Sequence, residues 1–261
     1  MKNNEIEFAA IIVARLSSTR LPQKNILPIV GKPMVQLLIE RVSTSKNINK
    51  VIIATSDLPS DDPLQDVADN IGIPCYRGPL DNIMERIILT ADKFKILNIV
   101  EILGDNPLVH SDIIDDVIDL YKKNDCDYAA NITNEYGNTG KNLLKFSVGL
   151  RVQVYKTEVA KRYREYPEWI TEHKHPTSFI FENQSDFRLA FLEAKGKWSF
   201  MNRPHLNFAV NYEKNFSLVK KIFEANYNNC SNFPLNEVYD QLDRDINLYS
   251  LLGAEKISDS F

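Results

Sequence analysis

Short apolar runs alternate with amphipathic stretches through the first half of the chain. The apolar runs are rich in β-branched residues and cover residues 8–14, 50–56, 73–78, 98–104 and 127–132. Between them, apolar residues recur every three or four positions at residues 34–44, 61–70, 81–94 and 111–123. Strands that alternate with helices of about ten or more residues are typical of βαβ units. The pattern therefore predicts an α/β fold built on a doubly wound, mainly parallel sheet.

The pattern changes after about residue 140. Residues 146–156 alternate with period two, which predicts an antiparallel strand or a projecting arm. The later part of the chain is expected to form a helix, two strands and two more helices, at residues 158–165, 188–194, 206–211, 212–225 and 235–242. Because no low-complexity linker or internal repeat separates the two halves, we expect one domain over residues 1–261.

Composition and charge narrow the class of protein. The 261 residues carry 31 Lys and Arg against 35 Asp and Glu, a formal net charge of −4. A mildly acidic chain argues against nucleic acid as a partner, which needs a basic face. No apolar run approaches the roughly 20 residues that span a membrane, and acids before the first apolar run are unlike a secretory signal. Three scattered cysteines predict neither a disulfide framework nor a zinc site. We therefore expect a cytoplasmic protein that does not bind membranes.

Positive charges gather directly after the first expected strand. Arg15, Arg20, Lys24 and Lys32 lie in a loop-like stretch, with hydroxyl groups at residues 17–19 among them. Ligands of doubly wound folds bind at the carboxyl ends of the strands, and guanidinium groups bind phosphate oxygens with paired hydrogen bonds. The stretch therefore predicts a phosphate site. The alternative is a solvated surface loop whose charges match distant acids.

Two later positions are candidates for the same site. Asp105 follows a buried strand, in a turn that Pro107 stiffens. A carboxylate that faces a phosphate loop is well placed to hold Mg²⁺ at nucleotide phosphates, and the alternative is a turn residue that caps the next helix. Arg77 follows a short strand and could hydrogen-bond a base or sugar oxygen, although a structural role fits its position equally well.

Taken in order, these segments resemble the cytidylyltransferases of the acylneuraminate and 3-deoxy-manno-octulosonate class, above all the spore-coat polysaccharide biosynthesis branch. The resemblance covers nearly the whole chain. The residues that carry it are Ala14-Arg15, Ser18-Thr19-Arg20-Leu21-Pro22-Gln23-Lys24, Gly31-Lys32-Pro33, Ala54-Thr55-Ser56-Asp57, Arg77-Gly78 with Asp81 and Arg86, Gly104-Asp105-Asn106-Pro107-Leu108, Glu172-His173 with Pro176, and the segment around Asn211.

The resemblance implies a Rossmann-like nucleotidyltransferase fold with a strand-and-helix insertion, at approximately residues 140–205, for dimerisation and acceptor binding. It implies CTP and Mg²⁺, an anionic sugar or sugar-like acceptor, release of pyrophosphate in surface polysaccharide synthesis, and a homodimer. By the same resemblance, catalysis would fall to Arg15, Lys24 and Asp105, and metal binding to Asp105 and Asn211. The expected nucleotide-binding residues are Ala14, Arg15, Ser18, Thr19, Arg20, Lys24, Thr55, Arg77 and Asp81, and the expected acceptor-binding residues are Arg151, Gln153, Glu172 and His173.

Three positions depart from the family pattern. Asn211 stands where a metal-holding Asp is usual, and Arg151 and Gln153 replace the two acids of a strand that usually reads Gly-Leu-Asp-Val-Glu. One interpretation is a shifted register or divergence at non-essential sites. Another is a pocket for a more anionic acceptor, a phosphorylated or phosphonate compound paired with Arg151. A third is a catalytically impaired protein that binds a nucleotide without turnover, and a nucleotide other than CTP also fits the residues taken alone.

Overall fold

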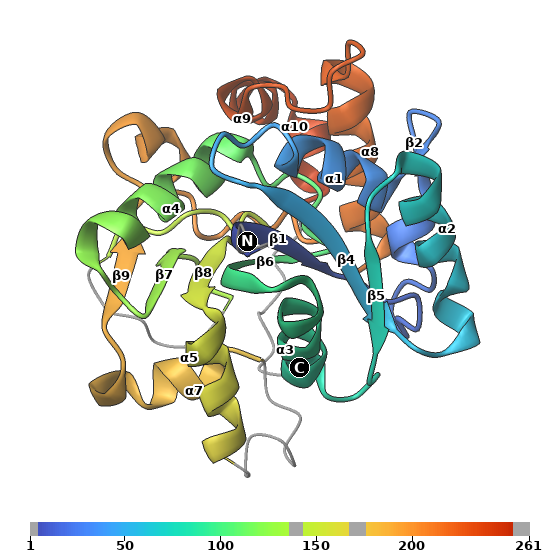
Figure 1. Ribbon diagram of the computed structural model, residues 1–261. Coiled ribbons are helices and arrows are strands. Elements are labelled where there is room, and N and C mark those ends of the chain that lie inside the picture. Colours follow the sequence, from blue (N-terminus) through green and yellow to red (C-terminus); the bar gives the residue numbers. More distant parts are fainter. Residues whose placement is uncertain (1–4, 136–142, 167–175, 253–261) are drawn as a thin grey trace.

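A computed structural model describes residues 5–135, 143–166 and 176–252 of the chain. A seven-stranded sheet lies at its centre, with helices on both faces (Figure 1). In the order in which they pair, the strands are β5 (Cys75–Gly78), β4 (Lys50–Ser56), β1 (Ile6–Val13), β6 (Ile96–Leu103), β8 (Gln153–Lys156), β7 (Tyr128–Asn131) and β9 (Leu189–Leu192). A separate short hairpin consists of β2 (Pro28–Ile29) and β3 (Lys32–Pro33).

β1 is the middle of the parallel part of the sheet. It pairs in parallel with β4 on one side and with β6 on the other. Successive residues of β1 enter cores on opposite faces, so that Ile11 belongs to one core and Ile12 to the other. A strand covered on both faces reads as a continuous apolar run, which is the pattern that located β1, β4 and β6. The predicted doubly wound, mainly parallel sheet is confirmed.

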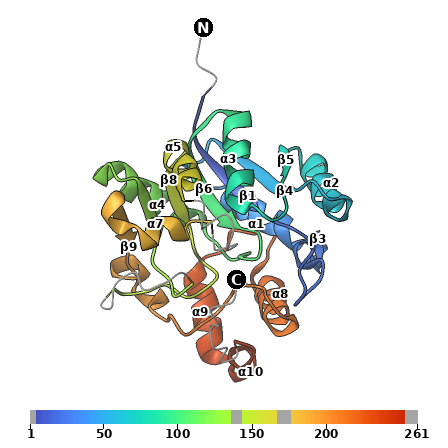
Figure 2. The same cartoon turned by 90° about the horizontal axis from the view of Figure 1, so that it is seen from below.

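The helices divide between the two faces of the sheet (Figures 1 and 2). The face with the larger core carries α1 (Met34–Val42), α2 (Asp62–Ile71), α4 (Ser111–Asn124), α8 (Glu213–Asn226) and α9 (Leu235–Arg244). The opposite face carries α3 (Ile83–Phe94), α5 (Thr157–Lys161) and α7 (Ser178–Glu182). α10 (Ile246–Ser250) follows α9 and packs on it. Among the described residues, no helix is long and apolar enough to cross a membrane.

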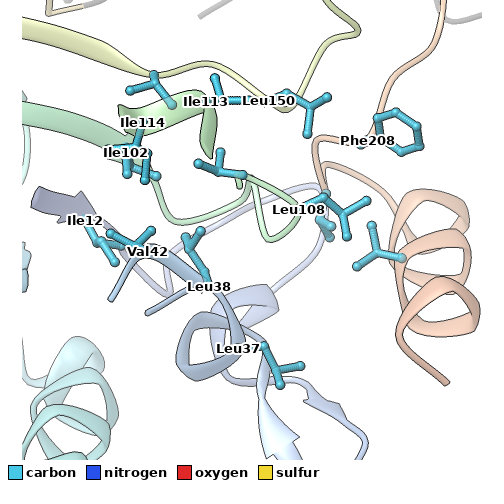
Figure 3. Packing of buried hydrophobic residues seen from close by; sticks show 14 of the residues in the cluster. Ile12, Leu37, Leu38, Val42, Ile102, Leu108, Ile113, Ile114, Leu150 and Phe208 are labelled. Carbon is cyan, nitrogen blue, oxygen red and sulfur yellow. The ribbon is translucent and has the colours of Figure 1, made fainter. Parts of the chain in front are cut away.

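The larger core contains residues of the sheet, of the helices on this face and of the turn after β6. Figure 3 shows Ile12 and Ile102 from the sheet together with Leu38 from α1 and Ile113 from α4. Leu108, in the turn after β6, is fully buried in the same core. Because Leu108 packs in this core, the core also fixes the turn after β6, which contains Asp105.

The antiparallel strand predicted at residues 146–156 is confirmed for its last part, β8. β8 lies inside the sheet, antiparallel to β6 on one side and to β7 on the other, so the alternative of a projecting arm is wrong. Period-two alternation is typical of any strand with two unlike faces, so the pattern alone could not separate a projecting arm from a central strand. The helix expected at residues 158–165 is formed by α5 and a 3₁₀ turn, Arg162–Glu165.

The strand predicted at residues 206–211 is also wrong, because only one isolated bridge forms there, between Val148 and Asn207. Gly149 explains the interruption. Its φ of +86° lies in the left-handed region, and a Cβ at this position would meet the Ala209 backbone nitrogen at 2.3 Å. The backbone turns at Gly149 where the two segments touch, so neither can continue as a strand.

A buried arginine ties α1 to two distant segments. The Arg41 guanidinium is fully buried and donates to the carbonyl oxygens of Leu108, Val109 and Ser231, the distances to the first two being 3.2 and 3.0 Å. It also lies over the Phe233 ring, 4.6 Å from the ring centroid. Burial lowers the pKa of Arg41 to about 9, so the group stays charged at neutral pH. Arg41 therefore holds the turn after β6 against the C-terminal part of the chain.

We predict that Arg41→Met lowers the free energy of unfolding by about 3 kcal/mol, because buried carbonyl groups lose their donor. Urea unfolding measures the change. The control is Arg244→Met, at the exposed end of α9, which should change stability by less than about 0.5 kcal/mol. Equal effects of the two substitutions would contradict the role given to Arg41.

Candidate active site

A pocket opens at the carboxyl ends of β1 and β6. Three parts of the chain form most of its wall: the loop after β1, the first turn of α3, and the end of β6 with the following turn. The lining residues are Val13, Ala14, Arg15, Ser17, Ser18, Thr19, Arg20, Lys24, Asn25, Ile83, Arg86, Leu103, Asp105 and Pro176. The pocket thus brings together seven of the predicted site residues: Ala14, Arg15, Ser18, Thr19, Arg20, Lys24 and Asp105.

The loop after β1 is held in shape by hydrogen bonds to its backbone. Gln23 donates its backbone N–H to the Leu16 carbonyl oxygen (3.1 Å), which closes the loop. The Asn25 side-chain amide donates to the Arg15 carbonyl oxygen (2.9 Å), and the Ser18 hydroxyl accepts from the Leu21 N–H (3.3 Å). With the backbone fixed in this way, the side chain of Arg15 is left exposed at the pocket, where its guanidinium can bind an anion.

Asp61 anchors the start of this loop, and sequence reasoning missed it. Its carboxylate is fully buried and accepts hydrogen bonds from the Leu16 backbone N–H (2.8 Å) and the hydroxyls of Thr55 (3.1 Å) and Ser56 (2.5 Å). Such a carboxylate is stable in the interior because each oxygen has donors. Three acids follow β4 within six residues, at positions 57, 61 and 62, and the sequence gives no signal to tell which one turns inward.

Thr55 is placed in this buried network. Its side chain is fully buried, and its hydroxyl donates to Asp61. Thr55 is not among the lining residues of the pocket. Its predicted contact with a nucleotide stays a prediction, and the observed position of the hydroxyl is a structural one.

Lys24 and Asp105 meet across the pocket. The Lys24 ammonium lies 2.7 Å from the Asp105 Oδ2, 2.7 Å from the Val210 carbonyl oxygen and 3.3 Å from the Asn211 Oδ1. Only 8% of Lys24 is exposed, so these bonds lie largely away from water, where charge-assisted hydrogen bonds are strong. The arrangement brings both predicted metal-binding residues, Asp105 and Asn211, to one cation.

Gly104 allows the Asp105 turn to approach the first loop. Its backbone N–H donates to the Val13 carbonyl oxygen at 2.8 Å. A Cβ at this position would meet the Ala14 Cβ at 2.8 Å and the Asn25 Oδ1 at 3.1 Å. A residue with a side chain would therefore push the acid away from the cationic loop.

Arg77 and Asp81 lie outside the pocket wall. The Arg77 guanidinium donates to the carbonyl oxygens of Ser56 (3.1 Å) and Leu58 (2.7 Å) and pairs with Asp62 (2.5 Å). These contacts hold the segment after β4, and the structural alternative for Arg77 fits this position. Asp81 is exposed, and the cap of α3 is the neighbouring Asn82, which accepts from the Glu85 N–H. Their expected contacts with a nucleotide stay predictions.

Arg86, from the first turns of α3, contributes to the pocket wall and was given no role from the sequence. Its guanidinium is buried and donates to the carbonyl oxygens of Pro79 (2.9 Å) and Leu80 (3.3 Å). Burial, together with the nearby Arg15 charge, lowers the pKa of Arg86 to about 10. It therefore remains a cation at neutral pH, and adds positive charge beneath the pocket. An arginine on a helix gives no signal of this kind in a sequence.

The predicted acceptor residues Arg151 and Gln153 lie in a buried polar network behind the pocket wall. Arg151 is 4% exposed and donates to the Tyr128 hydroxyl (2.9 Å), which donates to the Gln153 Oε1 (2.7 Å). The same Oε1 accepts from the Thr177 hydroxyl (2.7 Å). Neither Arg151 nor Gln153 is a lining residue, although Thr177 adjoins Pro176, which is. Their acceptor role stays a prediction, and Glu172 and His173 lie outside the described residues.

A buried acid belongs to the same network. Glu101 on β6 lies opposite Gln153 on β8, and its Oε2 accepts from the Tyr155 hydroxyl (2.5 Å). Burial raises the pKa of Glu101 to about 7, against the opposing effects of Tyr155 and the Arg151 charge. The Glu135 carboxyl, after β7, also has a pKa raised by burial and lies near both Arg151 and Asp105. In their ionised forms, these acids offset the positive charge of Arg151 inside the protein.

The oxygens around Lys24 suit a hard divalent cation. Mg²⁺ prefers oxygen ligands and is often held by one or two carboxylates together with substrate phosphates. Asp105 supplies a carboxylate, and Asn211 supplies an amide oxygen. No cluster of three or more His, Cys, Asp or Glu able to hold a metal occurs in the described part of the chain. The residues fit a metal ion that completes its ligand shell with phosphate oxygens.

The fold and the pocket define an α/β nucleotidyltransferase-type protein, with a cationic loop after the first strand and an acid after a neighbouring one. A family model described as Cytidylyltransferase matches residues 9–228. The chain therefore belongs to the cytidylyltransferase family, and it is a nucleotidyltransferase.

Relatives and solved structures agree with this family. The spore coat polysaccharide biosynthesis protein SpsF of Bacillus subtilis is 25% identical over 226 residues, 85% of this chain and 87% of that protein. A cytidylyltransferase structure from Leptospira borgpetersenii superposes with a TM-score of 0.82 at 20% identity, over 97% of this chain and 99% of that one. A CMP:2-keto-3-deoxy-manno-octonic acid synthetase complexed with CTP has a TM-score of 0.60 at 17% identity, over 84% and 99% of the two chains. At these identities the two structures support the fold alone.

We predict that Thr55→Val lowers the free energy of unfolding by about 1 kcal/mol, because one of the Asp61 donors is lost. The rise in melting temperature that CTP produces should equal that of the unmodified protein. Thermal melts with and without CTP measure both quantities. Loss of the CTP-induced rise at unchanged stability would instead show that the hydroxyl binds nucleotide.

Glu101 should make stability depend on pH. Its pKa is about 7 in the folded protein against 4.5 for the ordinary group. Between these values the folded state binds more protons than the unfolded state, so the free energy of unfolding falls as the pH rises, by at most about 3 kcal/mol. Glu101→Gln should remove this fall. The free energy of unfolding of the variant should therefore rise relative to that of the unmodified protein as the pH increases from about 5 to about 8. Urea unfolding across this range measures the difference.

The control for this measurement is Glu237→Gln, because Glu237 is an exposed acid on α9. Its stability should follow that of the unmodified protein at every pH. A Glu101→Gln profile parallel to the unmodified one would contradict the raised pKa.

Proposed function

We propose that this protein is a Mg²⁺-dependent cytidylyltransferase that joins CMP from CTP to an anionic sugar or sugar-like acceptor and releases pyrophosphate. The observation that carries the proposal is the pairing of the cationic loop with Asp105 at one pocket. Family membership supports the cytidylyl group. The relative named for spore coat polysaccharide biosynthesis supports a role in surface polysaccharide synthesis.

The reaction needs positioning and charge stabilisation rather than a covalent nucleophile. An acceptor oxygen attacks the α-phosphorus of CTP, and the bond from that phosphorus to the bridging oxygen breaks. Negative charge therefore builds on the leaving pyrophosphate. Arg15 and Arg20 project from the loop toward the pocket, where they would bind the β- and γ-phosphates and stabilise that charge. The loop backbone, fixed through Asp61 and Asn25, would hold these cations in place before the reaction.

Asp105 and Asn211 would hold the metal ion, which when bound neutralises phosphate charge and orients the α-phosphate. Lys24, a flexible point charge, would bind phosphate oxygens from the same side of the pocket. The reaction would take place in the cytoplasm, where CTP is available. A homodimer also belongs to the proposal, by family resemblance.

The acceptor would bind beside the apolar part of the wall, near Leu103 and Pro176. Arg151 lies behind this wall, 5.0 Å from the Phe181 ring centroid, with acids nearby. That position favours an ordinary carboxylate acceptor over a phosphorylated or phosphonate one, because the additional cation is bonded to Tyr128 behind the wall and is not a lining residue of the pocket. Incubation with CTP and a panel of carboxylated, phosphorylated and phosphonate sugars would separate these classes by pyrophosphate release.

One observation favours a second candidate, a nucleotide-binding protein without turnover. Asn211 supplies no charge, so Asp105 is the only carboxylate bonded to Lys24 among the described residues. If this is the function, CTP should raise the melting temperature while no acceptor releases pyrophosphate. Comparing CTP with GTP, UTP and ATP in the same melts identifies the base.

We predict that Arg15→Gln lowers kcat/KM for CTP on the order of 100-fold, because a cation that stabilises the leaving group is lost. The melting temperature should hardly change, since the Arg15 side chain is exposed and makes no hydrogen bond or ion pair within the described residues. Pyrophosphate release measures the rate. Arg244→Gln, remote from the pocket on α9, is the control and should keep full activity. An Arg15→Gln protein with unchanged kcat/KM would contradict the role of the loop.

A further inference from the structure

Lys24 occupies the centre of the oxygen set that suits a metal ion. Its ammonium has three N–H donors and cannot accept a hydrogen bond. Three oxygens surround it: the Asp105 Oδ2 and the Val210 carbonyl oxygen, each at 2.7 Å, and the Asn211 Oδ1 at 3.3 Å. These bonds use the full donor capacity of the ammonium. The Lys24 side chain, 10% exposed, is largely buried together with this site.

The charges at this site balance when Lys24 is in place. Asp105 contributes one negative charge and Lys24 one positive charge, while the Val210 carbonyl and the Asn211 amide are neutral dipoles. A carboxylate at position 211 would leave one negative charge over. With Asn211, a single monovalent cation suffices, and the lysine supplies it.

A divalent ion and the Lys24 ammonium cannot share these oxygens. Mg²⁺ lies about 2.0–2.1 Å from its oxygen ligands, so an ion bound to Asp105 and Asn211 would lie within the space of the ammonium. Two positive charges about 4 Å apart repel strongly in a site shielded from water. The lysine would have to leave before the ion could enter.

Nucleotide phosphates offer Lys24 another partner. Lys24 opens a 3₁₀ turn, Lys24–Ile26, that directly follows the cationic loop. Its side chain is a flexible stem with a point charge at the end, so the ammonium can turn from Asp105 to a phosphate without a change in the backbone. The same phosphates would supply the oxygen ligands that Mg²⁺ lacks.

We propose that Lys24 and a divalent metal ion compete for the oxygens of Asp105, Val210 and Asn211, so that the metal enters only when nucleotide phosphates draw the lysine away. The inference rests on the proposed function for the identity of the phosphates. The competition itself concerns the protein without nucleotide. It makes Lys24 a built-in counter-ion that keeps the site closed to metal until substrate arrives.

The test measures binding of Mn²⁺ alone, by electron paramagnetic resonance, to nucleotide-free protein. Lys24→Met should bind Mn²⁺ more tightly than the unmodified protein, on the order of 10- to 100-fold, because the ion no longer displaces a charge-assisted hydrogen bond. Mn²⁺ should also raise the melting temperature of Lys24→Met by more than that of the unmodified protein. The double variant Lys24→Met with Asp105→Asn should lose the gain.

Lys32→Met is the matched control. It removes the same charge from a lysine outside the pocket, whose ammonium pairs with Glu40 at 2.7 Å. Its Mn²⁺ affinity should equal that of the unmodified protein. A gain in Mn²⁺ affinity of the same size in Lys32→Met would show that the effect comes from the net charge of the protein, and would overturn the proposal.

Asn211→Asp tests the proposal without removing a buried side chain. Lys24 can neutralise only one of the two carboxylates, so Mn²⁺ affinity should rise, by a smaller factor than in Lys24→Met. If neither Lys24→Met nor Asn211→Asp binds Mn²⁺ more tightly than the unmodified protein, the proposal fails. Failure of the proposed function is distinguished by a separate result: the unmodified protein would release no pyrophosphate from CTP with any acceptor of the panel, whatever the Mn²⁺ titrations give.

Discussion

The bonds of one ammonium group hold together the part of the structure on which the site depends. Lys24 comes from the loop after the first strand, Asp105 from the turn after β6, and Val210 from the segment that leads into α8, yet Lys24 bonds to both of the others. Two backbone bonds close the same junction, from the Gly104 N–H to the Val13 carbonyl and from the Val210 N–H to the Asp105 carbonyl, each at 2.8 Å. The parallel pairing of β1 with β6 brings the first two segments together, and the junction adds the third. Without it, the segment that leads into α8 would not be held against the cationic loop and Asp105.

The loops around this junction are held from inside the protein by buried charged groups whose partners are mostly backbone. Asp61 accepts from the Leu16 N–H, Arg41 donates to two adjacent carbonyls in the turn after β6, and Arg86 donates to carbonyls before α3. A buried charge is tolerated only where such dipoles satisfy it. A buried charge without hydrogen-bond partners is costly. Each loop is therefore favourable only in the position where its backbone groups bond to the buried charge. The pocket can then present exposed cations on a backbone that does not have to rearrange when an anion binds.

The sequence could predict the elements and residues whose positions follow from periodicity, and it failed where a side chain's direction decides. Strands covered on both faces were found because their apolar runs are continuous, and Arg15, Lys24 and Asp105 were found because they follow such strands. The interruption at Gly149 removed the strand expected at residues 206–211, since a close approach between distant segments leaves no periodic signal. Thr55 and Arg77 were expected to contact nucleotide, which stays a prediction. Nothing in the sequence indicates their partners in the structure, which are Asp61 for the first and Asp62 with two carbonyls for the second. Asp61, Asn25 and Arg86 were missed because an acid, an amide or an arginine near an element's end is as common on surfaces as in sites.

The structure changes the interpretation of Arg151 and Gln153, which stand in place of the two acids of the family pattern. Arg151 is stacked against Phe181 and bonded to Tyr128, while Gln153 accepts from both Tyr128 and Thr177, so both side chains complete a network beneath the pocket. Glu101 and Glu135 lie near Arg151, and each of them, when ionised, reduces the effect of this cation on the field in the pocket. Asn211 is different, because it contacts Lys24 in the junction itself and alters the charge balance where phosphate and metal would bind. Of the three departures from the family pattern, the single loss of charge at position 211 therefore bears most directly on the chemistry.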